Sequence, residues 1–525
     1  MKLRKFLAIC LVLVLVLGMA ACGGSSSDED TTSNADKTEL VVIDSEWYGL
    51  DTYQLDSSSN GQGFVSATPF TWDSDNSCIA DNVCTDWTVS EDGLTVTFNV
   101  PEGLTYSTGE TVEPEDVVAS LEHGLEVSPY ADGYDNIESM DIDGRQVTLH
   151  LSHYSSAMEY YFCADFICII DKDELDTMTN EELMWGCHPY GPYYLAEDGY
   201  VSGSEVNLVR NDNYKCFNPK TDNQGPWNFE TVKFRFNVED FTATEELVNG
   251  TVDLLMTMSK EQRLELEGQE GVTVINASYP CINFLELNAD SPVFSDINVR
   301  KALALSIDRE SIAEIAEGSV TPAYSYIYDT VQCFSQDAYD WYKANLSNDK
   351  EKAKQLLDEA GWVDTDGDGI REKDGQKLEF TIDSWSSWST ITQAMANQLL
   401  EVGFQMDIEV IDWNYINENM RNDDYDAGER GLGWAEPILV LNMAYYDPDA
   451  PGNDDEYKAL VQACQEETDS QARVQRVYDA QMKIFESVEL IPLFGDNDYD
   501  AMNSELQGYV VNSDGTSTLN NLRYE

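Results

Sequence analysis

The chain has 525 residues, 42% of them apolar and 11% aromatic, which is enough for two or three domains with sizeable hydrophobic cores. Its 98 acidic and 30 basic residues give a net charge of −68 at pH 7. This charge argues against nucleic acid and anionic lipid surfaces as partners, because both would repel the protein. The charge either keeps the protein soluble or steers cationic solutes toward a binding site, and both interpretations stay open.

The N-terminus has the pattern of an export signal. Three basic residues precede an apolar run over 6–18, and small residues lead to Cys22. An apolar run of this length is short for a permanent membrane helix, so residues 1–21 are predicted to be a signal peptide. The cut site resembles a lipobox, which implies lipidation of Cys22. The polar segment 22–37 is then a flexible tether that holds the protein to the outer face of the cell membrane.

Nine cysteines follow the export signal, so at least one thiol stays unpaired. Cys78 and Cys84, and likewise Cys163 and Cys168, are close enough in sequence to form disulfides, or all four can remain buried thiols. Neither pair has the spacing of a zinc knuckle, and the chain has only four histidines. We therefore expect no thiol-bound metal.

The stretch 86–125 predicts a strand, a turn and a helix. Leu94, Val96, Phe98 and Val100 alternate with polar residues, which places their side chains on one face of a strand. Pro114 is suited to the first position of a helix, and apolar residues then recur at helical spacing up to residue 125.

Other elements follow the same rules of periodicity. Strands are expected at 39–43, with Trp47 and Tyr48 directly after the first, and at 147–151, 232–236 and 281–287. His150 and His153 are interpreted as packing or surface residues. Ser295, Asp308 and Asn348 are predicted to cap three successive helices.

An acidic loop, DTDGDGIREKDG, follows the third of these helices. Asp364, Asp366, Asp368 and Glu372 have the spacing of the first part of a calcium-binding EF-hand loop. Gly375 stands where the bidentate carboxylate would be. The loop is either a weak calcium site or a solvated turn.

A strand at 380–384 runs into a helix that we expect Ser389 to cap, and such a junction presents backbone N–H groups to a ligand carboxylate. Trp385 and Trp388 beside it either line a binding wall or pack in the core. A strand at 406–411 precedes a helix that opens at Trp413. The remaining predicted elements are a return strand ending near Trp434, a helix over 470–486 and a strand over 488–494.

Three of these segments together resemble a known family. The string around Trp87, Asp92-Gly93-Leu94-Thr95 and Asp116-Val117-Val118, the segment VRKALALSIDRESI with Asp308-Arg309, and VELIPLF resemble motifs of the extracellular solute-binding proteins of family 5. These proteins are the oligopeptide- and dipeptide-binding components of ABC importers.

The resemblance implies an α/β, type II periplasmic-binding-protein fold, in which two lobes with mixed sheets are joined by a two-strand hinge and an extra domain is inserted. On this basis residues 38–50, 186–280 and 490–525 form lobe I, residues 51–185 the inserted domain, and residues 281–489 lobe II. The lobes are expected to close on a bound solute and to present it to the permease.

The resemblance also implies a ligand site. In peptide-binding members the return strand carries a Trp, matched by Trp434, and then an Asp that pairs with the free amine of the ligand. Here Glu436 and Pro437 stand near that position, which weakens free-amine recognition. The predicted ligand-binding residues are Trp434, Glu436, Trp385, Trp388, Ser389, Trp413, Trp47 and Tyr48.

The expected function is capture of oligopeptides or dipeptides by a monomeric binding lipoprotein of an ABC importer. One alternative is the same fold with a non-peptide solute, such as an oligosaccharide, a metal chelate or a modified amine. A surface sensor or adhesion protein is another. An enzyme is not expected, because the chain lacks G-x-S-x-G and H-E-x-x-H, and 98 acidic residues make any glycosidase-like carboxylate pair uninformative.

Overall fold

The computed structural model describes residues 37–55, 60–72, 78–80, 83–164, 166–219, 221–442, 454–512 and 517–524. The predicted signal peptide, Cys22 and the tether up to residue 36 lie outside the described residues. Within the described ranges, no helix combines the length and the apolar character that a membrane crossing requires.

A seven-stranded mixed sheet forms the base of the molecule. Its strand order is β12 (Val272–Asn276), β21 (Tyr499–Asn503), β11 (Leu254–Leu255), β1 (Glu39–Ile43), β10 (Thr231–Arg235), β9 (Glu205–Arg210) and β8 (Tyr193–Val201). The central strand β1 pairs in parallel with both β10 and β11, and β21 pairs antiparallel with β11. Helices α6 (Asp240–Val248) and α7 (Lys260–Leu266) pack against strands β11, β12 and β21 of this sheet.

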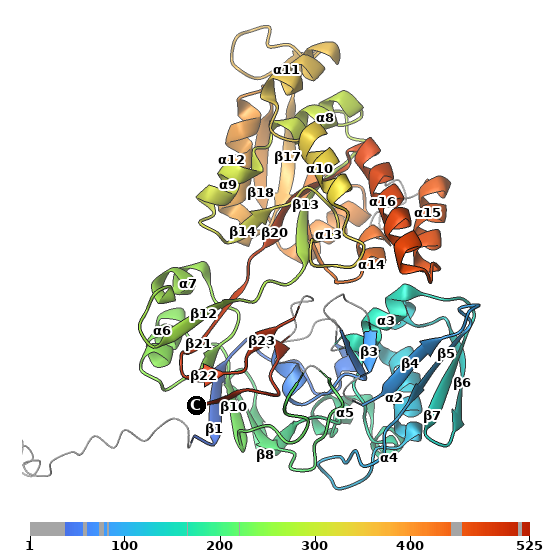
Figure 1. The fold of residues 1–525 in the computed structure, drawn as a ribbon. Helices are drawn as coiled ribbons and strands as arrows, with labels where there is room; N and C mark the ends of the chain where they lie inside the picture. The colour runs from blue at the N-terminus through green and yellow to red at the C-terminus, as the bar shows by residue number, and fades with distance from the viewer. Residues whose placement is uncertain are drawn as a thin grey trace, which may run out of the picture.

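A six-stranded mixed sheet forms the upper part in Figure 1. Its order is β14 (Val320–Pro322), β20 (Leu490–Asp496), β13 (Cys281–Leu287), β19 (Ala427–Gly433), β17 (Glu379–Ser384) and β18 (Gln405–Val410). Its helices are α8 (Ile297–Ser306), α9 (Arg309–Ile315), α10 (Gln336–Asn345), α11 (Lys350–Glu359), α12 (Ser389–Leu400), α13 (Trp413–Arg421), α14 (Pro437–Asn442), α15 (Asp455–Gln465) and α16 (Ser470–Ser487), with the short helix η5 (Ser386–Trp388).

The remaining sheet has four strands, in the order β4 (Thr85–Val89), β5 (Thr95–Asn99), β7 (Gln146–Leu151) and β6 (Ile137–Asp143). The helices of this part of the sequence are α2 (Pro114–Val127), which contacts β6 and β7, α3 (Ser156–Cys163), α4 (Lys172–Thr177), α5 (Asn180–Gly186), η2 (Thr52–Gln54), η3 (Asn60–Phe64) and η4 (Ala131–Gly133). Four strand pairs complete the fold: β2 (Phe70–Trp72) with β3 (Cys78–Ala80), β15 (Glu372–Lys373) with β16 (Gln376–Lys377), β22 (Leu506–Gln507) with β25 (Arg523–Tyr524), and β23 (Val510–Val511) with β24 (Ser517–Thr518).

Two chain segments join the seven-stranded and six-stranded sheets. Residues 277–280 lead from β12 to β13, and residues 497–498 lead from β20 back to β21 (Figure 1). The directions of the strands determine which strand ends lie at these crossings. Because β20 ends there and β17, β18 and β19 run in the same direction, all four strands end at the crossing edge. Because β21 starts there and is antiparallel to β11, strands β11 and β1 end at the crossing edge of the other sheet.

One buried carboxylate ties the two described ends of the chain to the base sheet. Asp253 accepts the backbone N–H of Val41 at 2.8 Å and pairs with Lys37 at 2.6 Å, and the hydroxyl of Tyr524 donates to the same side chain. Asp253 is fully buried, and Lys37 supplies the positive charge that makes this burial tolerable.

The mixed α/β class is confirmed, and so are most of the predicted elements. Val96 and Phe98 are buried on one face of β5 and Val100 is buried directly after it, while Leu94 lies in the preceding turn and is exposed. Helix α2 begins at Pro114 as predicted.

Two of the three predicted caps are wrong. Asp296, not Ser295, caps α8, and Asp349, not Asn348, caps α11, because these are the side chains that accept backbone N–H groups of the first turn. Asp308 caps α9 as predicted.

For the second pair of cysteines, the structure has no disulfide, because Cys168 is a free, buried thiol. For the first pair, Cys84 is buried, and the side chain of Cys78 lies outside the described residues.

The division into lobe I, inserted domain and lobe II stays a prediction, and we propose one change to it. Strand β20 pairs with β13 and β14 of the six-stranded sheet along its whole length. The border after lobe II therefore belongs at residues 497–498 rather than at residue 490, and we use the names lobe I and lobe II with this border.

The cap assignment at α8 can be tested by substitution. Asp296→Ala should lower the free energy of unfolding of lobe II by about 1 kcal/mol, because an N-terminal N–H group loses its acceptor. Ser295→Ala should change it by less than about 0.5 kcal/mol, because Ser295 is exposed and caps nothing. Urea unfolding followed by circular dichroism measures both. An equal loss in the two variants would contradict the assignment.

Candidate functional site

Most of the predicted ligand-binding residues directly follow strands that end at the crossing edges. Trp47 and Tyr48 follow β1 in the base sheet. In the six-stranded sheet Trp385 follows β17, Trp413 comes shortly after β18, and Trp434 follows β19. In open α/β sheets ligands bind outside the carboxyl ends of the strands, so both sheets present their ligand-binding edges to the same pair of crossing segments.

Within the six-stranded sheet, the structure brings two of the predicted tryptophans together. The rings of Trp385 and Trp413 lie 6.0 Å apart, and Trp385 is 44% exposed. Trp434 is half-buried and packs against the core. Trp385 and Trp413 form an aromatic pair past the ends of β17 and β18, which we call the tryptophan wall.

Four other predicted residues have different surroundings. Trp388 and Trp47 are core residues, and the Trp47 ring packs 4.7 Å from that of Phe234. Tyr48 is 61% exposed and is available to a ligand. Ser389 is exposed and lines a hollow of about 610 Å³ between α9 and α12, together with residues such as Ile315 and Gln398.

The predicted role of Ser389 as a cap is wrong. Ser389 is the first residue of α12, and the N-cap position of this helix belongs to Trp388. The N-cap residues of η5 and α12 form no side-chain capping hydrogen bond. The backbone N–H of Trp385, expected to face a ligand carboxylate, donates instead to Glu429 at 2.9 Å. This backbone N–H group is therefore already hydrogen-bonded to a carboxylate of the protein itself.

Glu429 is completely enclosed and has no cationic partner among its hydrogen bonds. Its carboxyl group accepts Ser384 Oγ at 2.9 Å, the Trp385 N–H and the hydroxyl of Thr392. Burial raises its pKa from 4.5 to about 7, and the three donors only partly oppose this rise.

Glu436, another predicted ligand-binding residue, is also bound by a group of the protein itself. It is buried and forms an ion pair with Arg473 of α16. Its carboxylate also accepts the backbone N–H of Ile438 at 3.1 Å. In this structure the cation beside Glu436 is therefore an arginine of the same protein.

Four carboxyl groups that the sequence analysis missed lie along the second crossing and beside it. Asp496, Asp498 and Asp500 alternate through residues 496–500, and Asp44 follows β1. Asp44 and Asp500 are buried, and Asp500 is one cause of the raised pKa of Asp44. We call these four groups the hinge carboxyls.

The hinge carboxyls have neutral hydrogen-bond donors. Asp44 accepts the N–H groups of Ser45 and Gly61, and Asp496 accepts Asn283 Nδ2 at 2.7 Å. Desolvation raises the pKa of Asp44, which is buried, to about 6. The alternation D-x-D-x-D after the strand at 488–494 was the sequence signal for them.

The acidic loop brings three of its four predicted calcium ligands together. Carboxylate oxygens of Asp364, Asp366 and Glu372 lie within 4.8 Å of one another. Asp368 instead pairs with Lys377 of β16. The donors are oxygens, as calcium requires, but only three carboxylates converge. Calcium binding at this loop stays a prediction.

Calcium titration with isothermal calorimetry tests that prediction. We expect binding in the range of weak, extracellular-type sites, about 10⁻⁴ to 10⁻³ M, because the ligand set is incomplete. Asp364→Asn should abolish the heat, and Asp407→Asn, an exposed acid on β18, should leave it unchanged. Absence of heat in the wild-type protein would identify the loop as a solvated turn.

The pKa of Glu429 predicts how stability depends on pH. A carboxyl group whose pKa is raised on folding stabilises the native state below its unfolded pKa, and this contribution is lost as the pH rises through the folded value. Stability should therefore fall between about pH 4.5 and 7.5, with roughly 3 kcal/mol from Glu429 alone. Glu429→Gln, which mimics the neutral acid, should flatten the melting temperature over this range. An unchanged slope in the variant would show that Glu429 does not titrate there.

Comparison with known proteins gives a consistent result for sequence and for fold. A family model, "Bacterial extracellular solute-binding proteins, family 5 Middle", matches residues 79–450. The oligopeptide-binding protein AppA of Bacillus subtilis is 24% identical over 470 residues, which cover 83% of this chain and 82% of AppA.

Two solved structures have the same fold. NikA from Brucella suis, solved in complex with Fe(III)-EDTA, superposes with a TM-score of 0.79 at 18% identity and covers 93% of this chain and 100% of its own. The periplasmic murein tripeptide-binding protein MppA, solved in an unliganded open form, superposes with a TM-score of 0.72 at 17% identity and covers 94% and 98%. With the family model matched over most of its length and the fold shared with these structures, the chain belongs to the bacterial extracellular solute-binding proteins of family 5.

Proposed function

We propose that this protein is the substrate-binding component of an ABC importer, that it captures oligopeptides or dipeptides outside the cell membrane, and that it delivers them to the permease. The observation that carries the proposal is the pair of sheets whose carboxyl edges face the same two crossing segments. We further propose that it acts as a monomer held by lipidated Cys22.

Peptides suit this geometry for a physical reason. An extended peptide between two sheet edges can satisfy its main chain by strand-like hydrogen bonds, while roomy contacts accept varied side chains. The tryptophan wall offers flat apolar surface beside that path. Closure of the lobes would then remove water and strengthen every charge contact with the bound peptide. Several relatives are named for binding peptides, AppA among them.

The hinge carboxyls favour ligands that carry positive charge. The pKa values of Asp44, Asp496 and Asp500 are raised chiefly by loss of water, and a bound ammonium or guanidinium group would restore a favourable partner for the ionised form. Peptides rich in lysine or arginine are therefore preferred over acidic ones in this proposal.

The alternative is a non-peptide solute in the same fold, such as a metal chelate, an oligosaccharide or a modified amine. Two observations favour it. Glu436, which lies near the position where peptide-binding members carry the amine-pairing Asp, is paired with Arg473, and NikA of the same fold was solved with a metal chelate.

Thermal shift measurements distinguish the two. Tri-lysine and tri-alanine should raise the melting temperature by mass action, tri-lysine more strongly, and Fe(III)-EDTA and cellotriose should not. Trp434→Ala should weaken peptide binding without a loss of stability beyond about 1–2 kcal/mol, because its ring is half-buried at the strand end. If the chelate or the sugar raises the melting temperature and neither peptide does, the ligand is a non-peptide solute and the peptide proposal is wrong.

A further inference from the structure

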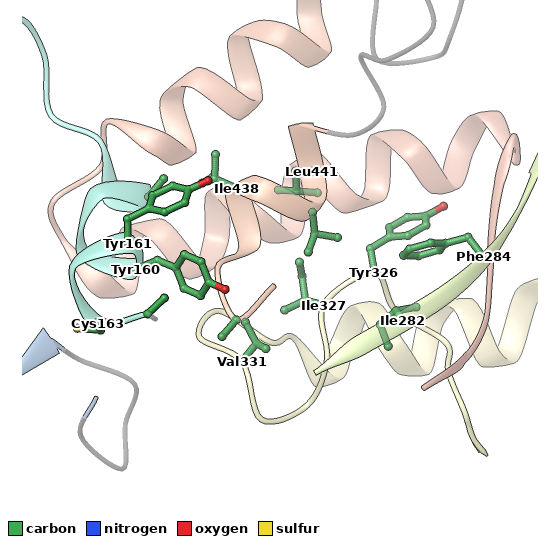
Figure 2. Packing of buried hydrophobic residues seen from close by; sticks show 14 of the residues in the cluster. Tyr160, Tyr161, Cys163, Ile282, Phe284, Tyr326, Ile327, Val331, Ile438 and Leu441 are labelled. Atoms are coloured by element: carbon green, nitrogen blue, oxygen red, sulfur yellow. The ribbon is translucent and has the colours of Figure 1, made fainter. Parts of the chain in front are cut away.

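The inserted domain meets lobe II at helix α3. Helix α3 of the inserted domain contacts α14 of lobe II, although the two are about 280 residues apart in sequence. Figure 2 shows Tyr160 and Tyr161 of α3 directed toward Ile438 of α14 and the segment that carries Val331. All four of these side chains are buried, so this is a packed junction rather than a loose touch.

A set of polar groups lies at the edge of that apolar junction, where α3 begins. Ser156 Oγ accepts Arg473 Nη2 at 2.7 Å and lies 3.4 Å from Glu436 Oε1. Ser155 Oγ accepts Gln465 Nε2 at 2.9 Å. We call this set the closing contact: two serines on the inserted domain, and Glu436, Gln465 and Arg473 on lobe II.

The two sides of the closing contact would separate if the lobes opened, but the ion pair would not. Glu436 and Arg473 both belong to lobe II and can stay paired in any arrangement of the lobes. The serine hydroxyls come from the other side. Opening therefore exchanges Ser156 for water around the pair, while closing shuts the pair into the protein, where Glu436 is 3% and Arg473 7% exposed.

We propose that the closing contact sets the balance between open and closed forms before any ligand binds. Arg473 is the positioning residue of this contact, because it binds both Glu436 and Ser156. A buried carboxylate is tolerated only when its cation is present, so loss of Arg473 penalises the closed form, in which Glu436 cannot reach water. Loss of the Ser156 hydroxyl removes a hydrogen bond to a charged group only from the closed form. Both changes favour opening.

An open form is accessible to this fold, because MppA was solved unliganded and open. The effect on ligands rests on the proposed function: if only the closed form holds its ligand tightly, apparent affinity falls in proportion to the closed fraction. The effect on the unliganded protein does not depend on what the ligand is.

Small-angle X-ray scattering of the full unliganded chain tests the inference. Ser156→Ala and Arg473→Gln should both give a larger radius of gyration than the wild type. Arg476→Gln is the matched control, because Arg476 lies on the same helix, pairs with Glu467 at 2.8 Å and has a side chain that is 46% exposed. This control should keep the wild-type profile. Wild-type profiles for both Ser156→Ala and Arg473→Gln would overturn the closing contact.

Two further measurements keep the outcomes separate. If circular dichroism shows that Arg473→Gln is unfolded, the scattering of Ser156→Ala alone decides the test. This variant should fold, because a serine at the first position of α3 is replaced by a good helix former. Calorimetry with tri-lysine should show about tenfold weaker binding to Ser156→Ala than to wild type. Failure of tri-lysine to bind the wild type contradicts the proposed function, whereas the scattering result still decides the closing contact.

Discussion

Burial of carboxylates is the constraint on which much of this structure depends, because the chain has 98 acidic side chains and only 30 basic side chains to pair with them. An ionised carboxylate in the protein interior requires a cation or several hydrogen-bond donors. The chain uses arginine for this purpose in lobe II, where Arg430 pairs with Glu286 at 2.6 Å and Arg473 pairs with Glu436. Where arginine is lacking, as at Glu429, three neutral donors and a raised pKa take its place.

The same constraint determines what remains for a ligand. The donor at Trp385 and the acceptor at Glu436 are both engaged by groups of the chain itself. The hinge carboxyls, by contrast, are held by neutral donors. Arg430 and Arg473 are bound to carboxylates within lobe II, whereas the hinge carboxyls add negative charge along the second crossing. A solute that brings positive charge therefore meets complementary surroundings, which links the acidic composition of the chain to its proposed ligands.

Much of the fold could be predicted from the sequence, because strand alternation and helix periodicity are local. The residues of β5 and the start of α2 at Pro114 are examples. The caps of α8 and α11 were misplaced by one residue, because neighbouring side chains such as Ser295 and Asp296 can both cap and only the backbone geometry decides between them.

The position of the candidate site followed from where the strands end, but its chemistry did not. Glu429 lies 44 residues from Trp385, and Glu436 lies 37 residues from Arg473. No local pattern in the sequence encodes such pairings, which arise only when the sheet and its helices are assembled. The hinge carboxyls did have a local signal, the alternation of Asp496, Asp498 and Asp500, but its meaning depended on the crossing that the topology places there.

The attachment of Lys37 and Tyr524 to Asp253 has a mechanical consequence. Both described ends of the polypeptide are fastened to lobe I, while lobe II is an excursion that leaves and returns through the two crossings. A load applied at either terminus would be borne by β1 and its two parallel neighbours, not by the two crossings. Whatever holds this molecule by its ends, be it a lipid, a resin or a fusion partner, pulls on lobe I and leaves the crossings to lobe II unloaded.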